Sequence, residues 1–597
     1  MTPQRSRSGG KLVVTGLPMA PGLAVGTPVF HAEHEVDVPV LAIEEEDIEA
    51  ERQRLSEAIA TARARLAEVE KTIREEVGAG DARIFSVHAL LLDDAHFRDG
   101  LAERIGQQLV NAEVAVRDEI AAWEHRLAGV TAAAGDRDPA ADLRDVGRQL
   151  MRVLAGHPSQ VALGDGDGHV VLVTPELLPS DAVHLDRTRL AAIVTGSGGV
   201  ASHAAILART LGIPAVTGVD VDSLPALGGR WIVDGNAGSV ILNPTESDLE
   251  QAERRSKDYD RFRSELMAQS RGFATTADGA GIEVMLNVEN FEDLPDELVE
   301  GLAGIGLYRT EFLYMNRAHF PSEEEQVDHY VAALNKVGDR EITFRTIDVG
   351  GDKPLPYLAV PHEPNPVLGW RGLRLSLEWP DMFYAQLRAL LRASAHGRMR
   401  ILFPMLTMVE EFRKARDIVR QIQSDLRRRG VAFDKDIKLG AMIEVPAAAL
   451  AARSIAEEAD FLSIGTNDLS QYALAVDRNN ARVASLYQPL HPGMINILRQ
   501  VVEAADVAGT PISLCGEMAG DPEATLLLLG LGLRSFSMPP YHLPVVKKVI
   551  GVVELREAQR VAREALELGS TTEIRSLLRR HTLKLMPELA AWLPAER

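Results

Sequence analysis

The C-terminal half of the chain repeats one pattern of hydrophobic and polar positions. Short apolar runs alternate with stretches of helix formers, and the pattern predicts eight strands at residues 282–288, 305–312, 342–349, 400–407, 439–446, 461–468, 511–518 and 535–539. Strands that alternate with helices eight times over are what a (β/α)₈ barrel requires. We therefore expect a barrel of the TIM type over residues 275–597.

In the N-terminal half, a helical pattern interrupts an α/β pattern. Residues 13–43 and 158–244 hold short β-branched runs broken by glycine and proline, which predicts strands and turns. Residues 44–157 are rich in helix formers. Within them, apolar positions spaced by three and four predict one buried helix face: Leu55, Ile59, Ala62, Leu66, Val69 and Ile73. The chain as a whole is thus expected to be a multidomain α/β protein with an inserted helical bundle.

Two further segments fall outside these units. Residues 1–12 carry basic side chains but no apolar run, so we expect a disordered extension and not a signal peptide. Residues 245–274 are charged and largely helical in composition, and they lack a strong apolar stripe. This second segment is interpreted as a linker helix.

Charge and cysteine content exclude several classes of function. The 597 residues include 86 acidic and 64 basic side chains, a net charge of −22. This balance argues against binding to nucleic acid or to an anionic membrane, and it is compatible with a basic protein partner. The single cysteine, Cys515, excludes a disulfide within the chain and any zinc site built from several thiolates. No apolar run reaches the roughly 18 residues that a bilayer requires, so we expect a cytoplasmic protein without membrane insertion.

A glycine cluster precedes a predicted helix that carries a histidine. Gly196, Gly198 and Gly199 follow an apolar strand, Ser202 is a candidate N-cap, and His203 falls in the first helical turn. Exposed amides and the helix dipole favour an anion at such a position. An imidazole beside an anion site can accept a phosphoryl group. A histidine that simply packs at a helix start is the alternative, and placement alone leaves both possibilities open.

Most of the predicted barrel strands end in a polar residue, where barrel enzymes place their catalytic groups. These residues are Asn287, Arg309, Arg345, Glu444, Asp468 and Cys515. The arginines, with Arg371 in the next segment, could clamp a phosphate or a carboxylate. Glu444 and Asp468 supply the oxygen ligands that suit Mg²⁺ held together with a substrate phosphate. For each residue taken singly, a salt bridge inside the barrel is the alternative.

Cys515 is a candidate proton donor. A thiol with an ordinary pKa of about 8.5 is mostly protonated at neutral pH, so it can act as a general acid. Buried cysteines more often serve as inert packing. The position at a strand end is the reason to consider a chemical role.

Seven segments together resemble enzyme I of the bacterial phosphotransferase system, the family of phosphoenolpyruvate–protein phosphotransferases. They are GGVASHAAILAR, GIGLYRTEFLYM, FRTIDVGGDK, NPVLGWRGLR, MIEVPAA, SIGTNDLSQYALAVDR and LCGEMAGD. The similarity extends from about residue 13 almost to the C-terminus. Pyruvate phosphate dikinase and phosphoenolpyruvate synthase share several of these motifs, but they carry an ATP-grasp domain where this chain has only the helical bundle.

The resemblance implies roles for individual residues. His203 corresponds to the histidine that is phosphorylated at Nε2, and Cys515 to the acid that protonates the enol carbon of the substrate. Glu444 and Asp468 correspond to the Mg²⁺ ligands. The residues implied to hold phosphoenolpyruvate are Arg309, Arg345, Arg371, Asn467 and Arg478, the last chiefly at the carboxylate.

The resemblance also implies partners and motion. Pyruvate would be released, and the phosphoryl group would pass to a histidine of the phosphocarrier HPr in the first step of sugar uptake. HPr would dock on the bundle, where Asp93 and Asp94 could attract a basic carrier. Two barrels would form a homodimer. The phosphohistidine domain would swivel between barrel and carrier, with its hinge near residues 245–274.

Three residues depart from the family pattern around the phosphorylated histidine. Ala201 and Ala182 stand where threonine is expected, and Val200 where arginine or proline is common. A threonine hydroxyl could orient the imidazole, so these changes bear on the rate of phosphotransfer. The sequence leaves three alternative functions open. They are a dikinase- or synthase-like enzyme with another phosphoryl source, a regulatory enzyme I paralogue, and a non-catalytic regulator that binds phosphoenolpyruvate or pyruvate.

Overall fold

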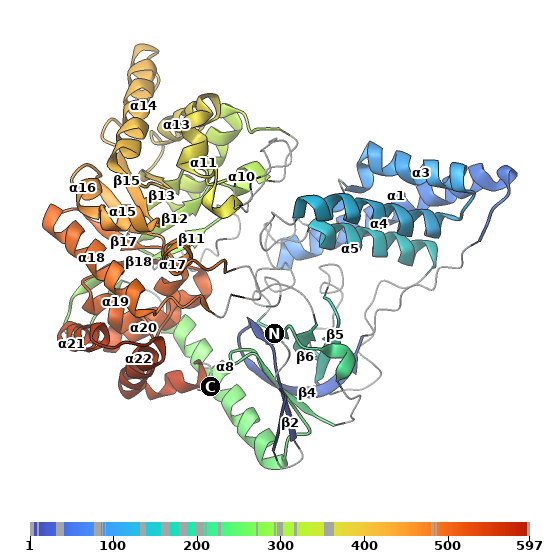
Figure 1. Ribbon diagram of the computed structural model, residues 1–597, viewed down its shortest axis with the longest axis horizontal. Helices are drawn as coiled ribbons and strands as arrows, with labels where there is room; N and C mark the ends of the chain where they lie inside the picture. Colours follow the sequence, from blue (N-terminus) through green and yellow to red (C-terminus); the bar gives the residue numbers. More distant parts are fainter. Residues whose placement is uncertain are drawn as a thin grey trace. The chain divides into compact units, whose positions relative to one another are not determined.

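The computed structural model divides the chain into two compact units (Figure 1). One unit comprises residues 1–261 with 590–597, and the other comprises residues 262–589. The structure describes residues 5–8, 11–31, 41–76, 91–131, 139–156, 168–177, 188–196, 212–224, 229–269, 273–291, 302–315, 319–350, 365–478 and 486–593, with Phe85, His88, Ala89, Ala208, Leu294, Glu363 and Val483 between them.

The first unit contains a nine-stranded mixed sheet in the order β1-β2-β9-β8-β4-β5-β6-β7-β3. Neighbours from β4 to β7 run parallel, and the other pairs run antiparallel. The strands are β1 (Arg5–Ser8), β2 (Lys11–Thr15), β3 (Leu17–Ala20), β4 (Leu23–Phe30), β5 (Val170–Thr174), β6 (Leu190–Thr195), β7 (Ala215–Thr217), β8 (Trp231–Asp234) and β9 (Ser239–Leu242). Valines of β5, β6 and β7 pack with Trp231 in its core.

Strand β1 differs from the expected disordered extension. Arg5–Ser8 pairs antiparallel with β2, with Arg5 opposite Val14 and Ser8 opposite Lys11. A ladder of backbone hydrogen bonds needs no apolar side chains, so the lack of an apolar run did not reveal the strand. The prediction of disorder over the whole of residues 1–12 is therefore wrong for this strand.

The helical insertion forms a bundle as predicted. Its described helices are α1 (Ile48–Glu76), α3 (Ala95–Gln108), α4 (Ala112–Thr131) and α5 (Pro139–Leu154). The predicted apolar face of α1 is buried at Leu55, Ile59, Ala62, Leu66 and Val69. The side chain of Ile73 lies outside the described part. These apolar residues share one core cluster with residues of α3, α4 and α5.

The second unit is a closed barrel of eight parallel strands, β11 to β18, in which β11 also pairs with β18. The strands are β11 (Gly281–Val288), β12 (Gly304–Arg309), β13 (Glu341–Arg345), β14 (Met399–Phe403), β15 (Lys438–Ile443), β16 (Phe461–Ile464), β17 (Ile512–Leu514) and β18 (Ser535–Met538), and the short β10 (Ala274–Thr275) pairs antiparallel with β11. All eight predicted strands are present, so the barrel prediction is confirmed.

Helices alternate with the barrel strands (Figure 1). They are α10 (Phe312–Met315), α11 (Glu323–Val337), α12 (Leu373–Glu378), α13 (Pro380–Ala393), α14 (Val409–Arg428), α15 (Pro446–Leu450), α16 (Ala452–Ala456), α17 (Thr466–Leu474), α18 (Pro492–Ala508), α19 (Thr525–Gly530), α20 (Leu543–Val552), α21 (Leu555–Leu566) and α22 (Thr571–Leu585). Among the described residues, none of the helices has the length and apolar character needed to cross a membrane.

The predicted helix after the first unit is α8 (Glu246–Gln269). Leu249 and Ala252 near its start are buried against Leu23 and Ile232 of the sheet. The division between the two units falls within this helix, after Arg261. One continuous helix therefore connects them.

Candidate active site

Two buried guanidinium groups share one carboxylate at the C-terminal ends of the barrel strands. Arg345 ends β13 and is 5% exposed, and Arg371 is 2% exposed. The carboxylate of Asp348 accepts from Arg371 twice, at 3.1 Å from Nε and 2.7 Å from Nη2. Its Oδ2 also lies 3.4 Å from Nη1 of Arg345. Asp348 therefore holds both arginines in fixed orientations.

Neighbouring carboxylates keep these arginines charged. Burial alone would lower the pKa of both side chains, because a buried charge loses its hydration. For Arg345 the nearby Glu311 and Asp348 outweigh burial, and for Arg371 Asp348 and Asp468 do so, so both pKa values are raised. Glu311 accepts from Nη2 of Arg345 at 2.8 Å and from the Asp348 amide at 2.8 Å. Both guanidinium groups therefore remain charged although they are buried.

Two carboxylates complete this cluster. Glu444 follows β15 and is buried, and its Oε1 accepts from the Met405 amide at 2.6 Å. Asp468 lies 3.2 Å from Nη2 of Arg371. Burial, followed by repulsion from Asp468 and Asp348, raises the pKa of Glu444 to about 7. A cation between these carboxylates would relieve that repulsion.

The two carboxylates fit a hard divalent cation such as Mg²⁺. Their donor atoms are all oxygen, which is the chemistry that Mg²⁺ prefers. Within the described part of the chain, no group of three or more histidine, cysteine, aspartate and glutamate side chains is arranged to hold a metal. Mg²⁺ normally keeps several waters and binds substrate phosphate through only one or two carboxylates. Glu444 and Asp468 suit that kind of site.

Asp468 is displaced from its predicted location at a strand end. Strand β16 stops at Ile464, and Asp468 lies in the first turn of α17. In the sequence SIGTND, Gly465 separates the end of the strand from the start of the helix. The order of apolar and polar residues alone does not show where the strand ends. The carboxylate still reaches the rim because the first turn of α17 directly follows the strand.

Close backbone packing supports the cluster. Gly372, next to Arg371, has a φ of +57°, and a Cβ there would lie 2.9 Å from Cβ of Met405 and 3.0 Å from Oδ1 of Asp348. Met405 itself has a φ of +58°, a region that few non-glycine residues occupy. That conformation accompanies the hydrogen bond from its amide to Glu444. Gly372 and Met405 are therefore packed tightly beside the carboxylates of Asp348 and Glu444.

Cys515 directly follows β17 and is 2% exposed. It packs with Leu307, Leu402, Met442 and Phe461. Burial raises the pKa of its thiol to about 11, although a hydrogen bond from Ser463 Oγ to Sγ at 3.2 Å acts in the opposite direction. The side chain is therefore a protonated thiol at neutral pH, as a proton donor requires.

The other predicted ligands are held by different partners. Arg309 ends β12 in register with Arg345, is part-exposed, and donates to Glu289 at 2.6 Å. The amide of Asn467 donates to the Glu517 side chain at 2.9 Å and accepts from its backbone at 2.8 Å. The backbone of Arg478 donates to Gln471 at 3.1 Å. Of the predicted residues, Arg371 therefore contacts Asp468 directly, and Asp348 links Arg371 to Arg345. Arg309 and Asn467 pair with other carboxylates.

His203 lies outside the described residues, as do Ala182, Val200 and Ala201. Its role remains a prediction. The predicted end of its helix is described: Gly212 has a φ of +69°, and the Ile213 amide donates to the Ala208 carbonyl at 2.9 Å. A left-handed glycine with this hydrogen bond is typical of a helix C-terminus.

On the bundle, the two predicted acidic residues have structural partners. Asp94 caps α3 by accepting from the Phe97 amide at 2.9 Å. Asp93 lies 3.2 Å from the guanidinium of Arg63, and both side chains are exposed. The acidic pair therefore serves the local structure in addition to any role in binding.

Sequence reasoning missed the residues that hold the arginines. Asp348, Glu311 and Tyr472 were not singled out, although Tyr472 accepts from Nη1 of Arg371 at 3.2 Å. The sequence did contain a signal for Asp348 and Glu311, because each lies near the C-terminal end of a predicted strand. Tyr472 lies on a helix face far along the chain, and no local pattern marks it.

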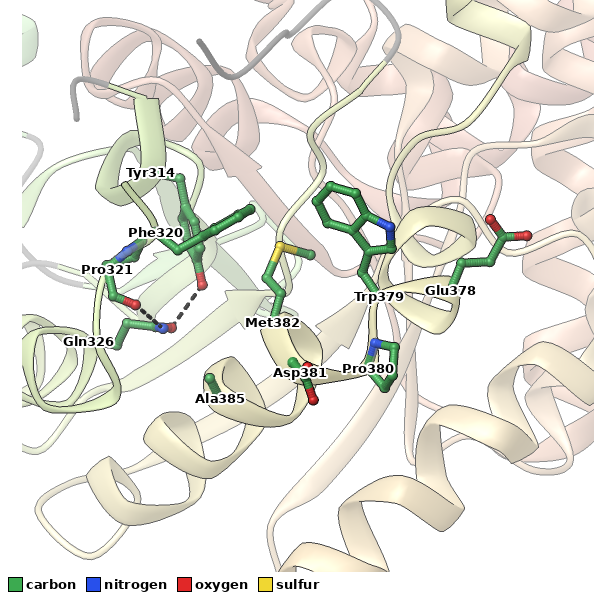
Figure 2. Close-up of a pocket in the computed structure, with 10 residues that line it drawn as sticks. All are labelled: Tyr314, Phe320, Pro321, Gln326, Glu378, Trp379, Pro380, Asp381, Met382 and Ala385. Carbon is green, nitrogen blue, oxygen red and sulfur yellow. Dashed lines mark hydrogen bonds between the residues drawn. The ribbon is translucent and has the colours of Figure 1, made fainter. Parts of the chain in front are cut away.

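A separate cavity of about 550 Å³ lies beside α11 and the α12–α13 junction (Figure 2). Figure 2 shows the rings of Phe320 and Trp379 on its walls, with Met382 between them. The hydroxyl of Tyr314 donates to Gln326 at 2.8 Å, and the Gln326 amide donates to the Pro321 carbonyl at 3.1 Å. The residues that the structure describes around this cavity include the carboxylates of Glu378 and Asp381 but no arginine or lysine, which is not the lining expected of a phosphate site.

Comparison with models of known protein families indicates the general class of enzyme. Three models of phosphoenolpyruvate-utilising enzymes match in order: the N-terminal model at residues 15–133, the mobile domain at 166–238 and the phosphoenolpyruvate-binding domain at 263–555. The barrel and its charged rim lie in the last of these. The fold and these three matches define a phosphoenolpyruvate-utilising enzyme.

Similarity to individual proteins narrows the class. The phosphoenolpyruvate-protein phosphotransferase of Geobacillus stearothermophilus is 40% identical over 94% of this chain and 97% of its own length. That of Haemophilus influenzae is 36% identical over 96% and 99%. A solution structure of Enzyme I (nEIt) is 30% identical, covers 41% of this chain and 99% of its own, and has a TM-score of 0.34. The chain belongs to the family of phosphoenolpyruvate–protein phosphotransferases.

Proposed function

We propose that this chain takes the phosphoryl group of phosphoenolpyruvate onto His203, releases pyruvate, and passes the group to a histidine of the phosphocarrier HPr. Family membership supports the reaction type. The single observation that carries the site assignment is the buried pair Arg345 and Arg371, bound to one carboxylate at the barrel rim. Burying so many charges is costly unless a charged ligand uses them.

The arginines bind the phosphate of the substrate. Arg345 and Arg371 are already oriented by Asp348, so little rearrangement is needed when an anion arrives. Planar guanidinium groups match phosphate oxygens in pairs. Arg309, from the neighbouring strand, adds a third positive charge. Asn467 and Arg478 also hold the substrate, Arg478 chiefly at the carboxylate.

Glu444 and Asp468 hold Mg²⁺ in this proposal. When bound, the ion supplies positive charge that neutralises the transferring phosphoryl group and the departing enolate. The ionised forms of both carboxylates are required, and the raised pKa of Glu444 reflects how unfavourable that state is without a cation.

The bond changes then follow. The P–O bond to the enol oxygen breaks, a P–N bond forms at Nε2 of His203, and the electron pair of the broken bond stays on the enolate. Cys515 gives its thiol proton to the methylene carbon, which leaves a thiolate and forms the carbonyl of pyruvate. Solvent returns a proton to sulfur. Protonation at carbon removes the enolate, and this makes phosphoenolpyruvate a strong donor.

The remaining parts of the chain carry the phosphoryl group from the barrel to HPr. The bundle of residues 44–157 docks HPr, with Asp93 and Asp94 attracting its positive charge. Residues 158–244, with 13–43, form the phosphohistidine domain, and α8 provides the hinge region for its swing. The barrel of residues 275–597 forms a homodimer. The single cysteine suits a reducing, cytoplasmic setting.

The test uses the full chain with phosphoenolpyruvate, Mg²⁺ and purified HPr. We expect pyruvate and phosphorylated HPr to appear in equal amounts. The variant His203→Ala should form neither and should still bind phosphoenolpyruvate. If HPr became phosphorylated by that variant, the nucleophile assignment would be refuted.

A further inference from the structure

A buried serine is hydrogen-bonded to the one cysteine of the chain. Ser463 lies on β16, and its Oγ–H donates to Sγ of Cys515 at 3.2 Å. Both side chains are buried. The backbone of Cys515 is tied to the same strand, because its amide donates to the Ile464 carbonyl at 3.0 Å. Two neighbouring strands therefore fix the hydroxyl and the sulfur relative to each other.

The surroundings make this contact chemically informative. The sulfur lies in a cluster of Leu307, Leu402, Met442 and Phe461. A hydroxyl in such a setting costs free energy unless it finds a good acceptor, and a neutral thiol sulfur is a weak one. A hydrogen bond to an ion is stronger than one to a neutral group. The serine hydroxyl therefore stabilises a thiolate more than the thiol.

The thiol proton itself is weakly held. The S–H group donates to the Ile464 carbonyl at 3.5 Å, and a thiol is a weak hydrogen-bond donor. A hydrogen bond from so weak a donor can be broken at little cost. The proton can thus turn toward a substrate while Ser463 continues to hold the sulfur.

We propose that Ser463 is a positioning residue for proton transfer from Cys515, an inference that rests on the proposed function. In that transfer the S–H bond breaks and a C–H bond forms at the methylene carbon of the enolate. The electron pair of the S–H bond remains on sulfur. The Ser463 hydroxyl stabilises this thiolate and holds it in place until a solvent proton restores the thiol.

The test compares two buried serines on adjacent strands. Ser463→Ala removes the hydroxyl that reaches sulfur. Ser513→Ala is the matched control, because Ser513 pairs in register with Ser463 but its hydroxyl donates to the Leu462 carbonyl at 3.4 Å. The full chain is incubated in D2O with phosphoenolpyruvate, pyruvate and Mg²⁺. Exchange of the pyruvate methyl hydrogens is followed by proton NMR.

We expect Ser463→Ala to slow methyl exchange by about 10- to 100-fold, the size of a hydrogen bond to an ion. Its solvent isotope effect on pyruvate formation should rise, because proton transfer becomes slower. The KM for phosphoenolpyruvate and the unfolding temperature should stay near those of the unmodified protein. Ser513→Ala should exchange at the normal rate.

Exchange at the normal rate in Ser463→Ala would overturn the inference. An equal loss in Ser513→Ala would do so too, since it would indicate a general packing effect. If the unmodified protein neither exchanges pyruvate hydrogens nor becomes phosphorylated, the proposed function itself fails. The two failures are therefore distinguishable.

Discussion

The guanidinium of Arg371 lies 3.2 Å from the carboxylate of Asp468, although 97 residues separate them in the chain. The same guanidinium binds Asp348, which in turn reaches Arg345. Positive and negative side chains thus alternate around the rim and are ordered before any substrate binds. Preorganised charges of this kind stabilise a transition state without first having to reorient.

Asp348 is the first residue to test. We expect Asp348→Asn to destabilise the barrel by about 3–5 kcal/mol, because it leaves two buried guanidinium groups without their shared anion. Calorimetry of the full chain measures the effect. Asp417→Asn is the control, because Asp417 forms an exposed ion pair with Arg420, and such surface pairs contribute about 0–1 kcal/mol. Equal losses in the two variants would contradict the role of Asp348.

Removal of the charge of Glu444 should separate metal dependence from stability. In Glu444→Gln, we expect Mg²⁺ to lose its effect on pyruvate formation, because a neutral amide is a poor ligand for a hard cation. Without Mg²⁺, the unfolding temperature should stay equal or rise, since the buried carboxylate is repelled by Asp468 and Asp348. Chelation of Mg²⁺ should stop pyruvate formation by the unmodified protein. A normal Mg²⁺ activation curve in the variant would refute this ligand assignment.

Gly372 offers a test of close packing at the rim. Gly372→Ala should lower kcat/KM for phosphoenolpyruvate and reduce stability, because its Cβ would approach Met405 and Asp348. Gly430→Ala is the control: Gly430 has a φ of +71°, and nothing lies within 4 Å of its added Cβ. The control should cost about 1 kcal/mol from backbone strain and leave kinetics unchanged. Steady-state assays measure kcat/KM for both variants, and an equal change in the two would contradict the role of close packing at Gly372.

The thiol of Cys515 predicts a specific pH dependence. Burial raises its pKa to about 11, so the folded state favours the protonated form. Between pH 9 and pH 11 the thiol ionises in the unfolded chain but not in the folded protein. The free energy of unfolding should therefore be unaffected by this group below pH 9 and fall by about 2–3 kcal/mol as the pH rises to 11. Cys515→Ala should remove this decline.

Alkylation provides a second measurement for the same thiol. Because only the thiolate reacts, the rate for the folded protein should keep increasing up to about pH 11. The denatured chain should level off near pH 9, and mass spectrometry reports on Cys515 alone because the chain has one cysteine. A plateau near pH 9 in the folded protein would show that burial does not control the thiol.

Periodicity was sufficient to predict most of the architecture. The apolar face of α1 and the eight barrel strands could be predicted because the spacing of apolar residues is a property of each helix or strand taken alone. Strand β1 was missed because a backbone ladder leaves no side-chain signal. Asp468 was placed on a strand because sequence boundaries between a strand and a following helix are weakly marked.

The charged cluster was predictable only in part. Arg345, Glu444 and Asp468 stood out because they are polar residues at the ends of predicted strands, and Arg371 because it lies in the segment after one of them. That Asp348 binds both arginines depends on how strands and connecting segments meet, and contacts such as Arg371–Tyr472 span 101 residues. No local pattern encodes such a pairing. The hydrogen bond between Ser463 and Cys515 was hidden for the same reason.

The most direct test of the central claim is the site and source of the phosphoryl group. The purified protein is incubated without HPr, with Mg²⁺ and either phosphoenolpyruvate or ATP, and its peptides are mapped by mass spectrometry. We predict one pyruvate released per gain of about 80 Da on the peptide that contains His203, with phosphoenolpyruvate only. A gain on that peptide from ATP, or pyruvate released without any phosphorylated histidine, would contradict the claim.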